Sequence, residues 1–147
     1  MATVQDENKQ LIQRWVDEFV NERALDRIGE FMAEDCYDNS ALPWVDPAGI
    51  DGPRQLFNAM FTAFPNIHVT IEEQIADGDK VMTRARFVGK HEGYFFAIPP
   101  TGREFDIGGI EIIRVENGKV KERWGGINEM SLMAQLGLFE QQQGGAT

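Results

Sequence analysis

The chain has 147 residues and a formal net charge of −10, and its 42% hydrophobic and 26% charged residues are typical of one globular domain. The acidic balance argues against nucleic acid, which needs a basic face, and against an anionic membrane surface. Cys36 is the single cysteine, which excludes an internal disulfide and a cysteine-rich metal site. We expect one domain over residues 1–147, with its core at 6–139 and a flexible tail at 140–147.

The N-terminal sequence MATVQDENKQ contains neither the basic region nor the apolar region of a secretion signal. No apolar run approaches the ~18 residues that span a bilayer. These two features predict a cytoplasmic protein without a membrane partner.

Three helices are predicted in the first half of the chain. The first begins at Asp6, and its apolar residues recur at helical spacing: Leu11, Ile12, Trp15, Val16, Phe19 and Val20. A second, short helix carries Leu25, Ile28, Phe31 and Met32 on one face. Residues 37–52 contain two prolines and two glycines and are predicted to form a loop. Pro53 is expected to be the first residue of a third helix, which Pro65 ends.

After Pro65 the apolar period changes to two, as in half-buried strands. Four apolar residues, Ile67, Val69, Ile71 and Ile75, alternate with the polar His68, Thr70, Glu72 and Gln74. Four strands are predicted. The first begins near Ile67, and the other three run from Val81 to about His91, from Phe105 to Val115 and from Lys119 to Trp124. Asn117-Gly118 is a strong hairpin signal between the last two. A short helix is predicted at Glu129–Leu136, ended by Gly137.

Helices followed by hairpin-linked strands predict an α+β fold, with the N-terminal helices packed on one face of a curved antiparallel sheet. A strongly curved sheet covered in this way leaves a concavity at its mouth. Small molecules bind in pockets of this kind, so we expect a small-molecule pocket.

The second half of the chain also carries a series of short motifs in a characteristic order. They are PheProAsnIle (64–67), AspGlyAspLysVal (77–81), GlyLysHisGluGly (89–93), IleProProThrGlyArg (98–103), GlyIleGluIleIleArgVal (109–115), AsnGlyLysValLysGluArgTrp (117–124) and GlnLeuGly (135–137). From Leu11 to Gly137 the chain resembles the SnoaL-like polyketide cyclase family of the nuclear-transport-factor-2-like superfamily.

The resemblance implies a cone-shaped α+β barrel, usually a homodimer, that works without a metal or organic cofactor. The cyclases of this family close a ring by intramolecular aldol condensation of an aromatic polyketide ester, with an aspartate near the start of the last helix as general acid/base. Relatives with the same fold hydrolyse epoxides, isomerise steroids or assist hydroxylation, so the fold alone does not define the reaction.

Two family positions are altered in this sequence. The aspartate expected four residues after Trp124 is Asn128, and Asp38-Asn39 stand where the family often has a histidine. An amide cannot take a proton at neutral pH, whereas aldol chemistry needs a base. Asn128 is interpreted either as the N-cap of the last helix or as a polar pocket residue that orients a substrate carbonyl.

Three other residues are candidates for acid/base catalysis. His91 shares the apolar side of its strand and is suited to proton transfer at neutral pH, or else it is a histidine satisfied by hydrogen bonds. Glu111 is either solvated or a buried base with a raised pKa. Asp106 is an odd number of residues from Glu111 on the same strand. The two side chains therefore point to opposite faces, and only one of these carboxylates should point inward. His68 is expected to be exposed.

Aromatic and polar residues are predicted to line the pocket, although a plain core role is open for each aromatic one. This set of substrate-binding candidates contains Trp124, Tyr37, Asn39, Trp44, Phe57, Phe61 and Phe95. A flat wall of this type suits an aromatic or polyketide-like ligand.

The leading hypothesis is therefore a cyclase-type enzyme that acts on a small polyketide-derived ketone or ester by cofactor-free acid/base catalysis. A hydrolase or hydroxylase of the same fold and a non-catalytic small-molecule-binding protein are the alternatives, because the usual catalytic position is Asn128. A third alternative is a structural dimer that works through its exposed sheet face.

Overall fold

The computed structural model describes residues 2–139, so the predicted flexible tail at 140–147 lies outside the described residues. The first helix, α1, spans Val4–Arg14 and continues as a π-helical segment, Trp15–Val20. It begins two residues before the predicted start because Thr3 and Asp6 form a reciprocal cap, in which each side chain accepts the other's backbone N–H. A 3₁₀ turn, Leu25–Arg27, and the short α2, Ile28–Phe31, follow.

Strand β1, Met32–Asp38, is an element that the sequence analysis missed. The pattern had placed Met32 in a helix and the residues from Tyr37 onward in a loop. The segment MetAlaGluAspCysTyrAsp is mostly polar, and its partner β5 is distant in sequence and parallel to it. No local hairpin signal exists for such a pair, so the strand forms only through tertiary contact.

Helix α3 spans Asp51–Ala63, so Pro53 is its third residue and not its first. The position is still compatible with proline, because the first four N–H groups of a helix have no partner within the helix. The helix ends before Pro65, as the sequence predicted.

The sheet contains β1 and four longer strands: β2 His68–Asp77, β3 Lys80–Lys90, β4 Glu104–Glu116 and β5 Lys119–Ile127. Their order is β1-β5-β4-β3-β2, with all neighbours antiparallel except β1 and β5. The predicted α+β fold is confirmed. Two details differ from the prediction: the sheet includes one parallel pair, and it is open, with β1 and β2 at its edges.

A bulge in β2 changes which side chains face inward. The register with β3 shifts between Ile71 and Glu73. Because one extra residue reverses the alternation of a strand, Ile75 lies on the outer face with 55% of its surface exposed. The strict alternation read from the sequence predicted Ile75 on the buried side.

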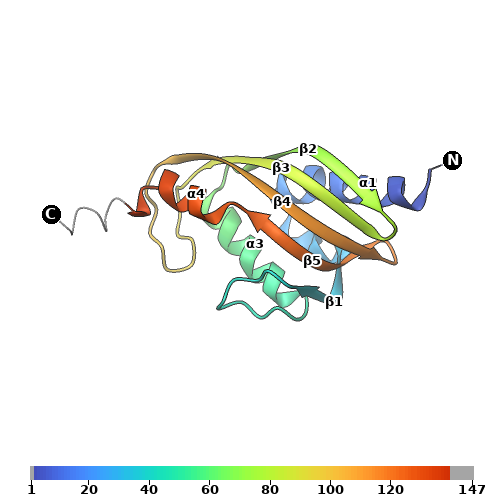
Figure 1. Cartoon of the computed structure of the whole chain (residues 1–147). Coiled ribbons are helices and arrows are strands. Elements are labelled where there is room, and N and C mark those ends of the chain that lie inside the picture. Colours follow the sequence, from blue (N-terminus) through green and yellow to red (C-terminus); the bar gives the residue numbers. More distant parts are fainter. Residues whose placement is uncertain (1, 140–147) are drawn as a thin grey trace.

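The N-terminal helices cover one face of the sheet, and α4, Glu129–Gln135, lies at the opposite end of the molecule from the N-terminus (Figure 1). Trp15 and Phe19 stack 4.1 Å apart in one apolar cluster with α3 and the inner sheet face. A second cluster joins Phe64 and Phe105 to Leu132 and Leu136 around α4. The sheet therefore has helices packed at both ends of its inner face. Within residues 2–139, no helix is long and apolar enough to cross a membrane.

Candidate active site

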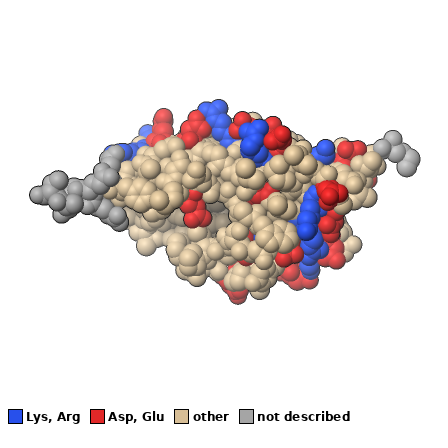
Figure 2. Space-filling view, viewed as in Figure 1, with Lys and Arg blue, Asp and Glu red and all other residues tan. Residues whose placement is uncertain are grey.

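A cavity of about 930 Å³ lies between the two apolar clusters. Trp15, Val16 and Ile113 of the first cluster line it, as do Phe64, Leu132 and Leu136 of the second. Figure 2 shows the surface hollowed toward the α4 end of the molecule, with acidic atoms at the hollow. The cavity is therefore mostly apolar and of a size that suits a small organic molecule.

A few polar residues interrupt this apolar wall. They include Asp38, Thr83, His91, Glu111, Arg123 and Asn128, besides Tyr37, Ser40, Arg84 and Glu129. Sequence reasoning had singled out three of them as catalytic candidates but missed Thr83 and Arg123.

His91 follows directly after β3 and is fully buried, with no exposed surface. Its backbone is tied to the opposite segment by bonds from its N–H to the Arg103 carbonyl and from the Gly102 N–H to its own carbonyl, both 2.9 Å. Its ring lies 5.5 Å from the Phe64 ring. The imidazole is thus held rigidly at the end of the cavity near α4.

The hydrogen bonds of His91 define its tautomer. The backbone N–H of Thr101 donates to Nδ1 over 3.2 Å, and the Thr101 hydroxyl lies 3.1 Å from the same atom. Since a backbone N–H can only donate, Nδ1 must accept, and the neutral ring carries its hydrogen on Nε2. Nε2 is buried and has no hydrogen-bond partner among the described residues. Neutral His91 therefore carries a hydrogen-bond donor at Nε2 and not a free basic nitrogen.

The pKa of His91 is lowered from its ordinary value of 6.5, chiefly because burial disfavours the charged ring. A weaker interaction with the backbone of Gly93 opposes this effect. The imidazole is accordingly neutral at pH 7, which keeps the donor role of Nε2.

Glu111 and Asp106 lie on opposite faces of β4. Glu111 lines the cavity, with its side chain 24% exposed. Asp106 is on the outer face, where Arg86 Nε donates to it over 2.7 Å and holds the pKa of its carboxyl below the ordinary value. Glu111 is thus the inward carboxylate of the pair, which the sequence left open.

Arg123 joins Glu111 to Asp38 inside the cavity wall. Its Nε donates to Glu111 Oε2 over 2.9 Å, and its Nη1 donates to both Asp38 oxygens over 2.9 and 3.0 Å. Burial would lower the pKa of Arg123, but the charges of the two carboxylates outweigh this and raise it. The guanidinium is therefore a permanent cation that orients both carboxylates.

Two consecutive glycines in β5 create the space for this arrangement. Gly125 and Gly126 have φ of 93° and 147°, values that other residues rarely adopt. A Cβ on Gly126 would lie 2.7 Å from Arg123 Nη2. Trp124 and Asn128 do not point the same way, because Trp124 pairs with the outward Ile112 whereas Asn128 lies beyond the end of β5.

Asn128 caps α4, one of the two roles considered from the sequence. Its Oδ1 accepts the Ser131 N–H over 3.1 Å, and its own N–H donates to the Gly108 carbonyl over 2.9 Å. The residue is exposed and also lines the cavity. Its Oδ1 is used by the helix, so the amide nitrogen is the part of the side chain without a bond to a described residue.

The predicted wall residues divide into two groups. Tyr37, Trp44, Phe57 and Phe95 line the cavity. Three others do not. Phe61 packs 5.7 Å from Phe19 in the core, Asn39 donates to Glu122 Oε2 over 3.0 Å, and Trp124 lies on the outer face with Lys80 Nζ 5.4 Å from its ring.

The placement of these three residues has local causes. Asn39 ties the end of β1 to β5, which requires it to point away from the cavity. Trp124 pairs with Ile112, an outward residue of β4, and Arg123 takes the inward position instead. His68, predicted to be exposed, is exposed.

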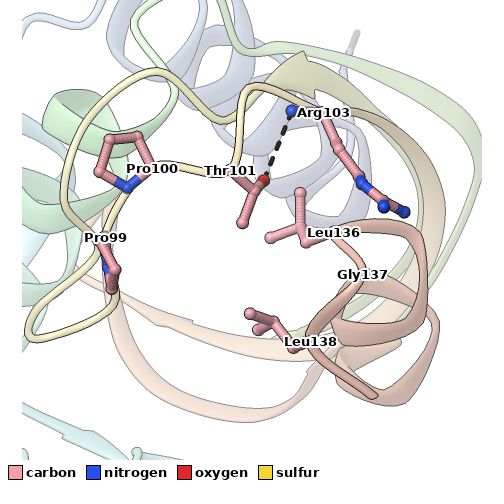
Figure 3. Close-up of a pocket in the computed structure, with 7 residues that line it drawn as sticks. All are labelled: Pro99, Pro100, Thr101, Arg103, Leu136, Gly137 and Leu138. Carbon is pink, nitrogen blue, oxygen red and sulfur yellow. Dashed lines mark hydrogen bonds between the residues drawn. The ribbon is translucent and has the colours of Figure 1, made fainter. Parts of the chain in front are cut away.

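A second, smaller cavity of about 430 Å³ lies beside the first, between the Pro99–Arg103 turn and Leu136–Leu138 (Figure 3). Thr101, whose backbone holds His91, forms part of its wall. Its hydroxyl also accepts the Arg103 N–H, drawn as the dashed line in Figure 3. Within residues 2–139, no group of three or more His, Cys, Asp or Glu side chains is arranged to hold a metal ion.

The fold and the cavity define a class of protein, a small α+β domain with a ligand cavity between its helices and the inner face of a curved sheet. The profile of the SnoaL-like polyketide cyclase family matches residues 10–136. The chain belongs to this family, as its motifs suggested.

Solved structures support the same fold. A protein from Jannaschia sp. CCS1, proposed to be a SnoaL-like polyketide cyclase, is 22% identical with a TM-score of 0.80, covering 92% of this chain and 95% of that one. AclR from Streptomyces galilaeus, proposed to be a hydroxylase, is 26% identical with a TM-score of 0.76, covering 90% and 97%. IdmH from Streptomyces antibioticus, proposed to be a polyketide cyclase, is 27% identical with a TM-score of 0.73, covering 88% and 98%. Among curated protein sequences, none matches.

The cap at Asn128 predicts different effects for two substitutions. Asn128→Asp should change the free energy of unfolding little, because both residues cap helices well, whereas Asn128→Ala should lower it by about 1 kcal/mol. Urea denaturation followed by circular dichroism measures both. Asn58→Ala, at an exposed position of α3, is the control and should not lower stability. Equal stability of Asn128→Ala and wild type would contradict the capping role.

The lowered pKa of His91 predicts a pH dependence of stability. As the pH falls below the unfolded value of 6.5, the unfolded chain takes up a proton that folded His91 resists. Stability should therefore fall between pH 7 and pH 5.5 in wild type, and less steeply in His91→Gln. Denaturant titrations at each pH measure the slope, with His68→Gln as control. Identical slopes in wild type and His91→Gln would contradict the buried neutral imidazole.

Proposed function

We propose that this protein is a cyclase-type enzyme that binds a small polyketide-derived ketone or ester in the large cavity and acts by cofactor-free acid/base catalysis. The observation that carries the proposal is the position of Glu111, a carboxylate on the inner face of the sheet within a largely apolar cavity. A base in such surroundings can remove a proton from carbon next to a carbonyl group.

The bonding of Glu111 supports this role. Oε2 accepts from Arg123, whereas Oε1 accepts no hydrogen bond from any described residue. In the proposed step, Glu111 takes a proton from the α-carbon of the substrate, and the resulting enolate carbon attacks a second carbonyl of the same molecule. A carbon–carbon bond forms, and the proton returns to the new alkoxide oxygen.

His91 has a different part in the proposal. It is eight residues beyond Thr83, the residue opposite Glu111, so the two sites are separated along the sheet by up to ~26 Å. The proposal therefore assigns His91 to a different part of the ligand from Glu111. Its Nε2–H and the Asn128 amide instead hold oxygens at the α4 end of an elongated ligand.

The alternative is a non-catalytic small-molecule-binding protein, and Asn128 favours it. The family's usual acid/base position carries an amide here, and that amide is used as a helix cap. A hydrolase or hydroxylase reaction is a further alternative, because AclR, proposed to be a hydroxylase, has the same fold. The cyclase-type enzyme removes a proton from the α-carbon of its ligand, and a non-catalytic binding protein does not, so this step distinguishes the two.

The role of Glu111 as a base can be tested without knowledge of the natural substrate. Wild type should accelerate exchange of the α-protons of 1-tetralone with deuterium, followed by proton NMR. Glu111→Gln should reduce this acceleration by about 10²- to 10⁴-fold, because the amide cannot accept the proton. Asp106→Asn, on the outer face of the same strand, is the matched control and should exchange like wild type.

Two outcomes would contradict the proposal. Equal exchange in wild type and Glu111→Gln would remove the catalytic role of this carboxylate. Binding of 1-tetralone by wild type without any acceleration of exchange would favour the non-catalytic alternative.

A homodimer and a cytoplasmic location belong to the same proposal. The outer face of the sheet exposes Ile75 and Ile110, each at 55%, and Ile112 at 40%. These side chains lie on β2 and β4 and form an apolar surface that a second copy of the chain could cover.

If this surface forms the dimer, wild type should sediment at twice the 16.6 kDa of one chain, and Ile110→Lys with Ile112→Lys should sediment as a monomer. The substitutions place two charges in the proposed interface, where they would lack partners. Met130→Lys, at an exposed position of α4, is the control. A monomeric wild type in sedimentation equilibrium would contradict the dimer.

A further inference from the structure

Four polar side chains form a continuous row across the inner face of the sheet. Thr83 on β3 is directly opposite Glu111 on β4, and Arg123 on β5 is directly opposite Asp38 on β1. The bond from Arg123 to Glu111 joins the two pairs. All four residues line the large cavity, and we call them the polar row.

Thr83 is the member of the row whose bonding is incomplete. It is 3% exposed, and its hydroxyl has no hydrogen-bond partner among residues 2–139. Buried hydroxyls in native proteins nearly always have a partner, because an unmet donor and acceptor in apolar surroundings are costly. The Thr83 hydroxyl therefore indicates a polar atom that enters the cavity from outside the protein.

The neighbouring groups restrict what that atom can be. Two carboxylates and one guanidinium give the row a formal charge of −1, from one positive and two negative groups, which disfavours an anionic ligand. Glu111 Oε1 has no donor among the described residues, so it can accept a hydrogen bond from a ligand. The Thr83 hydroxyl can donate to the same ligand atom. A neutral hydroxyl oxygen meets both requirements, because it donates one hydrogen bond and accepts another.

The walls on both sides of the polar row are apolar. Ala85 and Phe87 continue the inner face of β3 beyond Thr83, and Ile113 follows Glu111 on β4. A ligand hydroxyl at the row would consequently be attached to an apolar body. Aromatic side chains such as Phe57 in the cavity wall favour a flat one.

We propose that Thr83 and Glu111 form a subsite for the hydroxyl of a phenol or an enol, which donates to Glu111 Oε1 and accepts from Thr83 Oγ1. The inference rests on the proposed function, because an enol is the product of proton removal next to a carbonyl. Arg123, held by Asp38, fixes the orientation of the Glu111 carboxylate through its own hydrogen bond. A phenol is the stable analogue of the enol and binds without any reaction.

Fluorescence titration with four naphthalene probes tests the subsite: 2-naphthol, naphthalene, 2-naphthoate and 2-naphthylmethylammonium. They share one apolar body and differ in the group offered to the polar row. At pH 7 we expect 2-naphthol to bind more tightly than the other three. Thr83→Val should weaken the binding of 2-naphthol by about 2- to 10-fold and leave the affinity for naphthalene unchanged, because valine retains the shape of threonine and one hydrogen bond is lost. Thr70→Val, at an exposed position of β2, is the matched control.

Thr83→Ser retains the hydroxyl and should keep the preference for 2-naphthol, so it serves if Thr83→Val does not fold. Tightest binding of 2-naphthoate or of the ammonium probe would overturn the proposal. Equal affinities of 2-naphthol and naphthalene would overturn the subsite while leaving the cavity and the proposed reaction intact. Failure of every probe to bind would overturn both the subsite and the proposed function.

Discussion

The arrangement of the inner sheet face depends on the burial of Arg123. A guanidinium in an apolar wall requires negative partners, and the two that it has, Asp38 and Glu111, come from the strands on either side of β5. The charge thereby determines that β1 lies beside β5 and that Glu111 points inward. It also explains why Gly126 has no side chain, since a Cβ there would meet the guanidinium. One cation on β5 thus binds side chains of β1 and β4 and lies against the distorted backbone at Gly126.

The cavity is compatible with a stable fold because the packing is concentrated at its two ends. The Trp15–Phe19 stack with α3 closes one end, and Phe64, Phe105 and α4 close the other. Protein interiors are otherwise close-packed, so a space of about 930 Å³ persists only where rigid elements hold its walls apart. The curved strands provide this rigidity, since each central strand is bonded along both of its edges.

Sequence patterns predicted those features that depend on neighbouring residues. The hairpins, the last helix with its cap at Asn128, and the end of α3 at Pro65 all follow from local propensity. The features that were missed depend on pairing between strands: β1 as a strand, the bulge that exposes Ile75, and the pairing with Ile112 that places Trp124 on the outer face. The sequence identifies Glu111 as a carboxylate within an apolar strand. The inward direction of its side chain follows from the register of β4 with β3.

The parallel pairing of β1 with β5 has a consequence for the order in which the molecule is completed. Strands β2 to β5 are linked by contacts between successive segments, whereas Asp38 and Arg123 are 85 residues apart. Contacts of such long sequence separation carry the largest loop-closure entropy, and they form late. During synthesis the two carboxylates, Asp38 and Glu111, are made before Arg123 of β5, so their ion pairs cannot form until β5 is complete. A chain whose β2–β5 meander is complete but whose first strand is undocked therefore has Arg123 in place without Asp38, its second carboxylate partner.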